Sequence, residues 1–153
     1  MAEAIGRRYI AGRLGVQEDA LIAAGVRVAS GGLTDDYEPP ESPPSAHGVT
    51  AMLAHNYNTS AHRSTVLSSE QLQCAARIYC VSDSHRNWIL REHPGVEPNR
   101  VTTLGADVPD PWHGPLYEYE RTADTLLRLV PQKLGADWSN LQASLSLSLG
   151  DSG

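Results

Sequence analysis

The residues best suited to chemistry lie in one short loop, residues 108–114, with the sequence Val-Pro-Asp-Pro-Trp-His-Gly. Asp110 stands between two prolines, whose fixed φ angles stiffen the loop and hold the carboxyl group in place. Trp112 follows at once and offers an aromatic wall beside that carboxyl group. A positioned carboxylic acid next to an aromatic surface suits proton donation to an aromatic leaving group. The alternative is an ordinary surface turn ahead of a helix.

Length and charge narrow the class of protein. The chain has 153 residues, enough for one hydrophobic core, and a formal net charge of −6. This charge argues against a nucleic-acid partner, which would require a basic face. A phosphate ligand remains compatible, because phosphate sites use backbone N–H groups and a single arginine. No apolar run is long enough for a membrane span and no signal peptide is recognisable, so we expect a cytoplasmic protein with no membrane partner.

The possible metal ligands are dispersed along the chain. The two cysteines are Cys74 and Cys80, and the six histidines are spread from residue 47 to residue 113. No HExxH or CxxC motif is present, so the sequence predicts neither a metal site nor a cofactor. A chain of this length in a reducing compartment also needs no disulfide scaffold.

Hydrophobic spacing predicts helices that alternate with short strands. The clearest helix covers residues 116–134, where apolar side chains recur every three and four positions. Ser68 and Gln71 form a capping-box pattern and predict another helix start. This alternation favours an α/β three-layer sandwich with a short parallel sheet. The other expected elements are helices at residues 3–14, 19–24, 45–55 and 83–93, and strands at residues 26–28, 77–81 and 101–104.

The helical pattern weakens after residue 134. Gly135 is followed by a stretch in which serine and leucine alternate. We therefore expect one domain at residues 1–134 and a mostly disordered tail at residues 135–153. A strand is the alternative for the tail, because Leu145, Leu147 and Leu149 alternate with polar residues.

Five stretches with distinctive residues follow one another along the chain. They are Met1-Ala2-Glu3-Ala4, residues 28–33 (Val-Ala-Ser-Gly-Gly-Leu), His62-Arg63-Ser64, residues 80–85 (Cys-Val-Ser-Asp-Ser-His), and Asp110-Pro111-Trp112-His113-Gly114 followed by Tyr117, Tyr119 and Glu120. In this order they resemble the low-molecular-weight protein tyrosine phosphatases. The match runs from Met1 to about Val130, and its most specific part is the acid loop with the helix after it. The resemblance implies a phosphotyrosine phosphatase I-like fold.

The same resemblance implies a cysteinyl-phosphate mechanism. In that family a Cys-x5-Arg loop follows the first central strand and supplies the nucleophilic thiolate and the phosphate-binding arginine. Asp110 would be the general acid, and Trp112 and His113 would bind the substrate, a phosphotyrosine protein or a small aryl or guanidino phosphate. The resemblance begins at Met1, in the helix that follows that loop, so the loop and the central strand are missing from the match. We therefore expect the chain as given to be inactive, and the in-frame DNA upstream of Met1 to encode both.

One Cys-x5-Arg run does occur in the sequence, from Cys80 to Arg86. It contains no glycine, its Asp83 would repel phosphate, and it matches the family's third strand rather than the phosphate loop, so we interpret it as a chance match. Two other functions stay open. One is a truncated, non-catalytic relative that acts as a binding or relic protein. The weaker one is an arsenate reductase on the same scaffold, with Cys74 and Cys80 in electron transfer.

Overall fold

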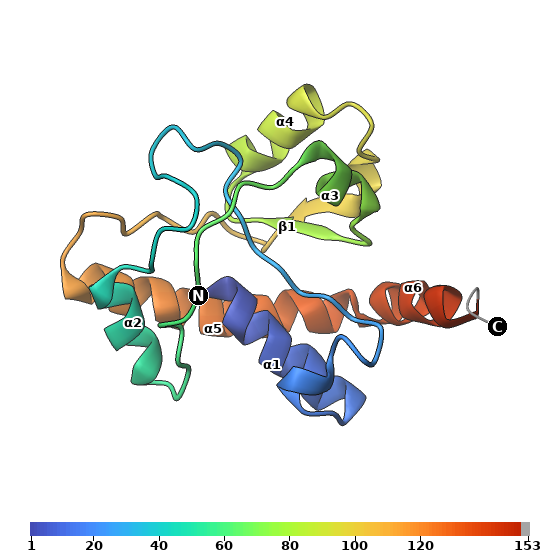
Figure 1. Ribbon diagram of the computed structural model, residues 1–153, viewed down its shortest axis with the longest axis horizontal. Coiled ribbons are helices and arrows are strands. Elements are labelled where there is room, and N and C mark those ends of the chain that lie inside the picture. Colours follow the sequence, from blue (N-terminus) through green and yellow to red (C-terminus); the bar gives the residue numbers. More distant parts are fainter. Residues whose placement is uncertain (151–153) are drawn as a thin grey trace.

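Two short parallel strands form the sheet in the part of the chain that the computed structural model describes, residues 1–150 (Figure 1). Strand β1 (Ile78–Cys80) pairs with β2 (Val101–Thr103), and Tyr79 lies opposite Thr102. Parallel strands require a crossover connection, which α4 (Asp83–Glu92) provides. The predicted α/β class with a small parallel sheet is therefore confirmed.

Local signals explain where several helices begin and end. Helix α1 (Ala2–Leu14) ends at Gly15, whose φ of 69° is the left-handed conformation that glycine adopts without strain. Helix α3 (Ser69–Cys74) begins with the predicted capping box between Ser68 and Gln71. The other elements are α2 (Ala46–Leu53), α5 (Leu116–Ala136), α6 (Trp138–Gly150) and the 3-10 turns η1 (Glu18–Ala20) and η2 (Pro98–Arg100).

Helix α5 organises the larger of two apolar cores. It crosses the molecule with α1 and α2 packed against it, while the sheet, α3 and α4 lie on the other side of α5 (Figure 1). Its buried face carries Tyr119, Ala123, Leu126 and Val130, which follow the predicted helical spacing. The smaller core lies among α3, α4 and the sheet, and consists of Leu72, Cys80, Ile89, Val96 and Val101.

The strand predicted at residues 26–28 is absent from the described part of the chain. These residues have no regular secondary structure and pair with neither β1 nor β2. Val28 instead packs against α1, close to Gly6. The nearest regular pairing is a single parallel bridge between Gly32 and Val66. Apolar alternation was present in the sequence, but a strand also needs a neighbour to complete its hydrogen bonds.

The structure differs from the expected tail at residues 135–153. Helix α5 continues to Ala136, and α6 covers residues 138–150. Trp138 is buried because its ring packs edge-to-face on Tyr9 and lies beneath the Arg13 guanidinium. The boundary at residue 134 therefore divides a continuous packed region. Residues 151–153 of the expected tail lie outside the described residues.

A buried carboxylate joins the end of α5 to the sheet. Asp137 Oδ2 accepts hydrogen bonds from the Arg77 guanidinium at 3.0 Å and from the Tyr79 hydroxyl at 2.8 Å. Arg77 also donates to the Asn99 carbonyl at 2.9 Å. Burial acts to raise the pKa of Asp137, but the hydrogen bonds from Tyr79 and Arg77 outweigh it and hold the pKa below its ordinary value. The carboxylate is therefore charged at neutral pH and fixes α5 against β1.

We predict that Asp137→Asn lowers the free energy of unfolding by about 2 kcal/mol, the usual contribution of hydrogen bonds to a charged group. The matched control is Asp124→Asn, which changes an exposed carboxylate of α5 whose partner is His55. Because that pair is solvent-exposed, its loss should cost less than about 1 kcal/mol. Urea denaturation of the wild-type protein and the two variants measures both effects. An equal loss of unfolding free energy in the two variants would contradict the stabilising role of Asp137.

The effect of Asp137→Asn should also depend on pH. A carboxylate with a lowered pKa in the folded state stabilises the protein above its unfolded pKa of about 3.9. The difference between the wild-type protein and the variant should therefore be constant near neutral pH. It should shrink as the pH falls below about 3.9 and through the lower folded pKa. A difference in stability between the wild-type protein and the variant that grew as the pH fell would contradict this prediction.

Candidate active site

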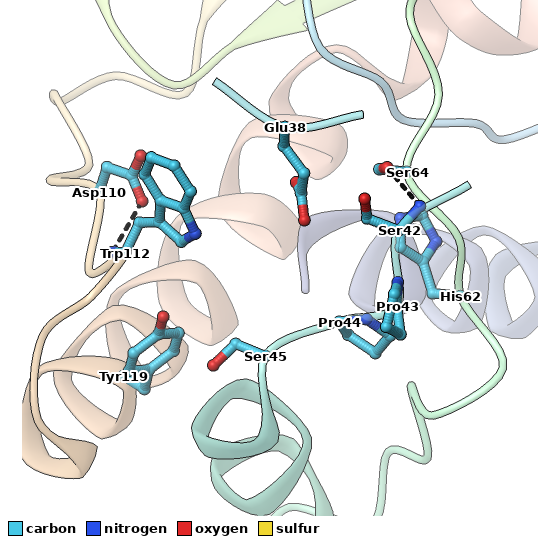
Figure 2. A pocket seen from close by; sticks show the side chains of 10 residues that line it. All are labelled: Glu38, Ser42, Pro43, Pro44, Ser45, His62, Ser64, Asp110, Trp112 and Tyr119. Carbon is cyan, nitrogen blue, oxygen red and sulfur yellow. Dashed lines mark hydrogen bonds between the residues drawn. The ribbon is translucent and has the colours of Figure 1, made fainter. Parts of the chain in front are cut away.

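The acid loop forms one wall of a cavity of about 260 Å³ (Figure 2). Residues 38–45 line the upper part of the cavity in this view and the side opposite the acid loop, and residues 62–64 continue that side. Asp110 and Trp112 face these residues across the hollow. Two of the three predicted site residues therefore line a single cavity. The lining residues are Glu38, Ser42, Pro43, Pro44, Ser45, His62, Ser64, Asp110, Trp112 and Tyr119.

Backbone contacts fix the position of Asp110. The Val108 N–H donates to the Val81 carbonyl at 2.8 Å, which ties the loop to the end of β1. The Trp112 N–H donates to Asp110 Oδ1 at 3.0 Å and orients the carboxyl group. Gly114 closes the loop, since a Cβ there would collide with the Glu118 carboxylate and stand 2.8 Å from the Pro111 carbonyl oxygen. The exposed carboxyl group is therefore held at the rim of the cavity.

The two other predicted site residues, Trp112 and His113, differ in their positions. Trp112 is not a core residue, because 43% of its surface is exposed at the cavity. His113 is not among the lining residues, and its ring lies against Trp112 with the centroids 4.0 Å apart. Its φ of 65° turns the chain sharply after Trp112. The structure therefore places His113 against the indole ring of Trp112 and outside the cavity lining.

Sequence reasoning missed the serine-rich wall opposite Asp110. The Ser42 N–H donates to Ser64 Oγ at 3.0 Å, and the Ser64 N–H donates to the Ser42 carbonyl at 2.9 Å. The Ser64 hydroxyl also donates to the Pro39 carbonyl at 3.0 Å. These bonds join two segments that are more than twenty residues apart, so no local pattern could predict them. The only signal in the sequence was the motif at residues 62–64. It indicated a family but did not indicate the contact between Ser42 and Ser64.

A carboxylate of α1 stands behind this wall. Glu3 Oε2 accepts a hydrogen bond from the Ser30 hydroxyl at 2.6 Å and lies 3.7 Å from His62 Nδ1. His62 lines the cavity, so the first turn of α1 lies directly behind the cavity wall (Figure 2). Helix N-termini carry partial positive charge and favour anions.

Neither cysteine belongs to the cavity. Cys80 is buried in the smaller core, and burial raises the pKa of its thiol to about 11. Arg86 donates through Nε to the Val101 carbonyl at 2.9 Å, so its guanidinium serves the packing of α4 on β2. These contacts agree with the interpretation of the Cys80–Arg86 run as a chance match. Among residues 1–150 no group of three or more potential metal ligands is found, and no helix is long and apolar enough to span a membrane.

Comparison with known proteins identifies the fold. No protein-family model and no curated protein sequence matches the chain. A YwlE arginine phosphatase with a phosphorylated active-site serine is 25% identical, with a TM-score of 0.73 over 92% of this chain and 90% of that chain. A low-molecular-weight protein tyrosine phosphatase from Bacillus subtilis is 26% identical, with a TM-score of 0.67 over 89% and 88% of the two chains. One from T. tengcongensis is 24% identical, with a TM-score of 0.71.

The chain therefore has the fold of the low-molecular-weight protein tyrosine phosphatases, and the resemblance seen in the sequence is confirmed. The first of these solved structures covers 92% of this chain and the Bacillus subtilis phosphatase covers 89% of it.

The environments of the two cysteines predict different reactivity. Cys74 is exposed, whereas Cys80 is buried with a raised pKa. Because the thiolate is the reactive form, iodoacetamide at neutral pH should label Cys74 and leave Cys80 unmodified until denaturant is added. Peptide mass spectrometry locates the label, and Cys74→Ser is the control that should remove native-state labelling. Rapid native labelling of Cys80 would show that this thiol is more accessible and more acidic than its contacts indicate.

Proposed function

We propose that this fold serves phosphomonoester hydrolysis of the protein tyrosine phosphatase type, with Asp110 as the general acid. The observation that carries the proposal is the position of Asp110, held by two backbone hydrogen bonds at the rim of a cavity in a phosphatase fold. The substrate would be a phosphotyrosine protein or a small aryl or guanidino phosphate. The structures of similar fold include both tyrosine and arginine phosphatases.

The cavity walls suit the leaving group of such a reaction. A phenolate leaving group has a pKa of about 10, so proton donation from Asp110 would assist its departure. The exposed face of Trp112 offers a surface on which an aromatic ring can stack. The first turn of α1 lies behind His62, and its partial positive charge, which the Glu3 carboxylate partly offsets, adds to anion binding. Phosphoryl transfer depends mainly on positioning and charge stabilisation, which a fixed loop and a helix end can supply.

The nucleophile is the part that the described residues do not supply. No cysteine lines the cavity, and the only cation-forming side chain there is His62. We propose that catalysis needs an additional segment that carries a thiolate and an arginine. A strand of this segment would pair beside β1 and extend the sheet towards a three-layer sandwich. The free edge of β1 and residues 26–30, which belong to no strand of the described sheet, support this position.

The environments of the two cysteines bear on the two alternative functions, arsenate reductase and a non-catalytic relative. An arsenate reductase would need accessible cysteines for electron transfer, and the burial of Cys80 disfavours that chemistry. A non-catalytic relative would use the same cavity for binding alone. The absence of a cavity cysteine among the described residues is the observation that keeps this second candidate open.

We predict that the 153-residue chain does not hydrolyse para-nitrophenyl phosphate. A protein extended by an in-frame upstream segment with Cys-x5-Arg should hydrolyse it, and Asp110→Asn should lower kcat by roughly 10²- to 10⁴-fold, the usual contribution of a general acid. The loss should be smaller for substrates with better leaving groups, because these need less protonation. The matched control is Asp107→Asn, directly before the loop, whose carboxylate does not line the cavity.

Steady-state kinetics with a series of aryl phosphates tests each part. Turnover by the 153-residue chain would show that the nucleophile lies within it. An extended protein that remained active after Asp110→Asn, with an unchanged dependence on the leaving group, would contradict the role of Asp110. A stop codon in frame directly upstream, with no Cys-x5-Arg segment before it, would favour the non-catalytic relative.

A further inference from the structure

A second hollow adjoins the cavity at its mouth and is lined by Tyr37, Glu38, Asp110 and Trp112. Three of these residues also line the main cavity, so the two hollows are adjacent. The rings of Tyr37 and Trp112 meet edge-to-face with their centroids 6.5 Å apart. A substrate that placed its phosphoryl group in the main cavity would pass its neighbouring residues over this aromatic pair.

Both aromatic rings are exposed to an unusual degree. Tyr37 is 79% exposed and Trp112 is 43% exposed, so neither ring contributes much to the cores. Glu38 lies between Trp112 and the serine-rich wall, with its carboxylate directed into the main cavity (Figure 2), and it lines the second hollow as well. Aromatic faces beside a carboxylate can hold a guanidinium or ammonium group through cation–π contact and charge attraction.

The segment that contains Tyr37 and Glu38 carries acidic side chains but no lysine or arginine. Residues 28–62 contain no lysine and no arginine, but they include Asp35, Asp36, Glu38 and Glu41. None of these four carboxylates forms an ion pair with any residue that the structure describes. All four residues are exposed, so they add mutual repulsion to the fold and no compensating contact. A partner that brings positive charge would remove this cost.

Binding of the proposed phosphate substrate would also be helped by positive charge on the partner. A phosphate dianion that approaches a protein of net charge −6 through an acidic mouth is repelled. Positive charge on the residue beside the phosphate offsets part of this repulsion and is itself attracted to the acidic mouth. Anionic membranes and nucleic acids would be repelled for the same reason, which leaves a basic polypeptide segment as the partner.

We propose that Tyr37, Glu38 and Trp112 form a specificity subsite for an arginine or lysine that flanks the phosphorylated residue of a protein substrate. This inference rests on the proposed function for the phosphorylated residue, but the basic side chain is recognised by groups that all lie within the described residues. The aliphatic stem of the basic residue would pack on the two rings while its charged end meets Glu38.

Peptide binding to the 153-residue chain tests this subsite without any turnover. The probes are two unphosphorylated peptides, Gly-Arg-Tyr-Arg-Gly and Gly-Glu-Tyr-Glu-Gly, titrated at low salt while the NMR signals of Tyr37, Glu38 and the Trp112 indole are followed. The arginine peptide should shift these signals and the glutamate peptide should not. Glu38→Gln should weaken binding of the arginine peptide about two- to fivefold, as expected for an exposed charge pair.

The matched control is Glu70→Gln, which removes an exposed carboxylate on α3, far from the mouth in sequence and unpaired among the described residues. It should leave the binding constant unchanged, while 0.5 M salt should weaken binding in every protein. Equal affinity for the two peptides, or an equal effect of Glu38→Gln and Glu70→Gln, would overturn the subsite.

A kinetic measurement separates failure of this inference from failure of the proposed function. In an active extended protein, Glu38→Gln should lower the ratio of kcat/KM for an arginine-flanked phosphotyrosine peptide to that for a glutamate-flanked one. An unchanged ratio would overturn the subsite even if hydrolysis were confirmed. Selective binding of the arginine peptide would support the subsite even if no extended protein were active.

Discussion

The carboxylate of Asp137 is the interaction on which the arrangement of the site depends. Its hydrogen bonds to Arg77 and Tyr79 hold the end of α5 against β1. The chain after β1 reaches Val81, whose carbonyl fixes Val108 at the start of the acid loop. The same helix α5 begins directly after that loop and contributes Tyr119 to the cavity. One buried carboxylate therefore holds the far end of α5 against the strand whose continuation anchors the acid loop.

The two walls of the cavity are held by different physical means. On one side, prolines and two backbone hydrogen bonds restrict a short segment around Asp110. On the other side, hydrogen bonds between Ser42 and Ser64 join two segments that have little regular structure of their own. Glu3 then links this second wall to α1. A rigid acid thus faces a polar wall whose geometry depends on long-range contacts.

The electrostatics of the cavity define what its residues can contribute to a reaction. Carboxylates and aromatic rings dominate the mouth, and the buried Cys80 thiol is held in its protonated form. These groups suit proton donation and the recognition of a substrate. Attack on phosphorus requires an activated nucleophile, and among the described residues no cysteine side chain lines the cavity.

The sequence alone determined the features that arise from neighbouring residues: the apolar face of α5, the capping box at Ser68 and Gln71, and the restrained acid between two prolines. Each depends on spacing within a few positions, so a local pattern contains all the necessary information. Tertiary structure decided the rest. It left residues 26–28 unpaired, buried Trp138 beyond the predicted boundary, and brought Ser42, Ser64 and Tyr37 to the site. These outcomes depend on partners that are distant in sequence, because a strand needs a neighbour and a cavity wall needs an opposite side.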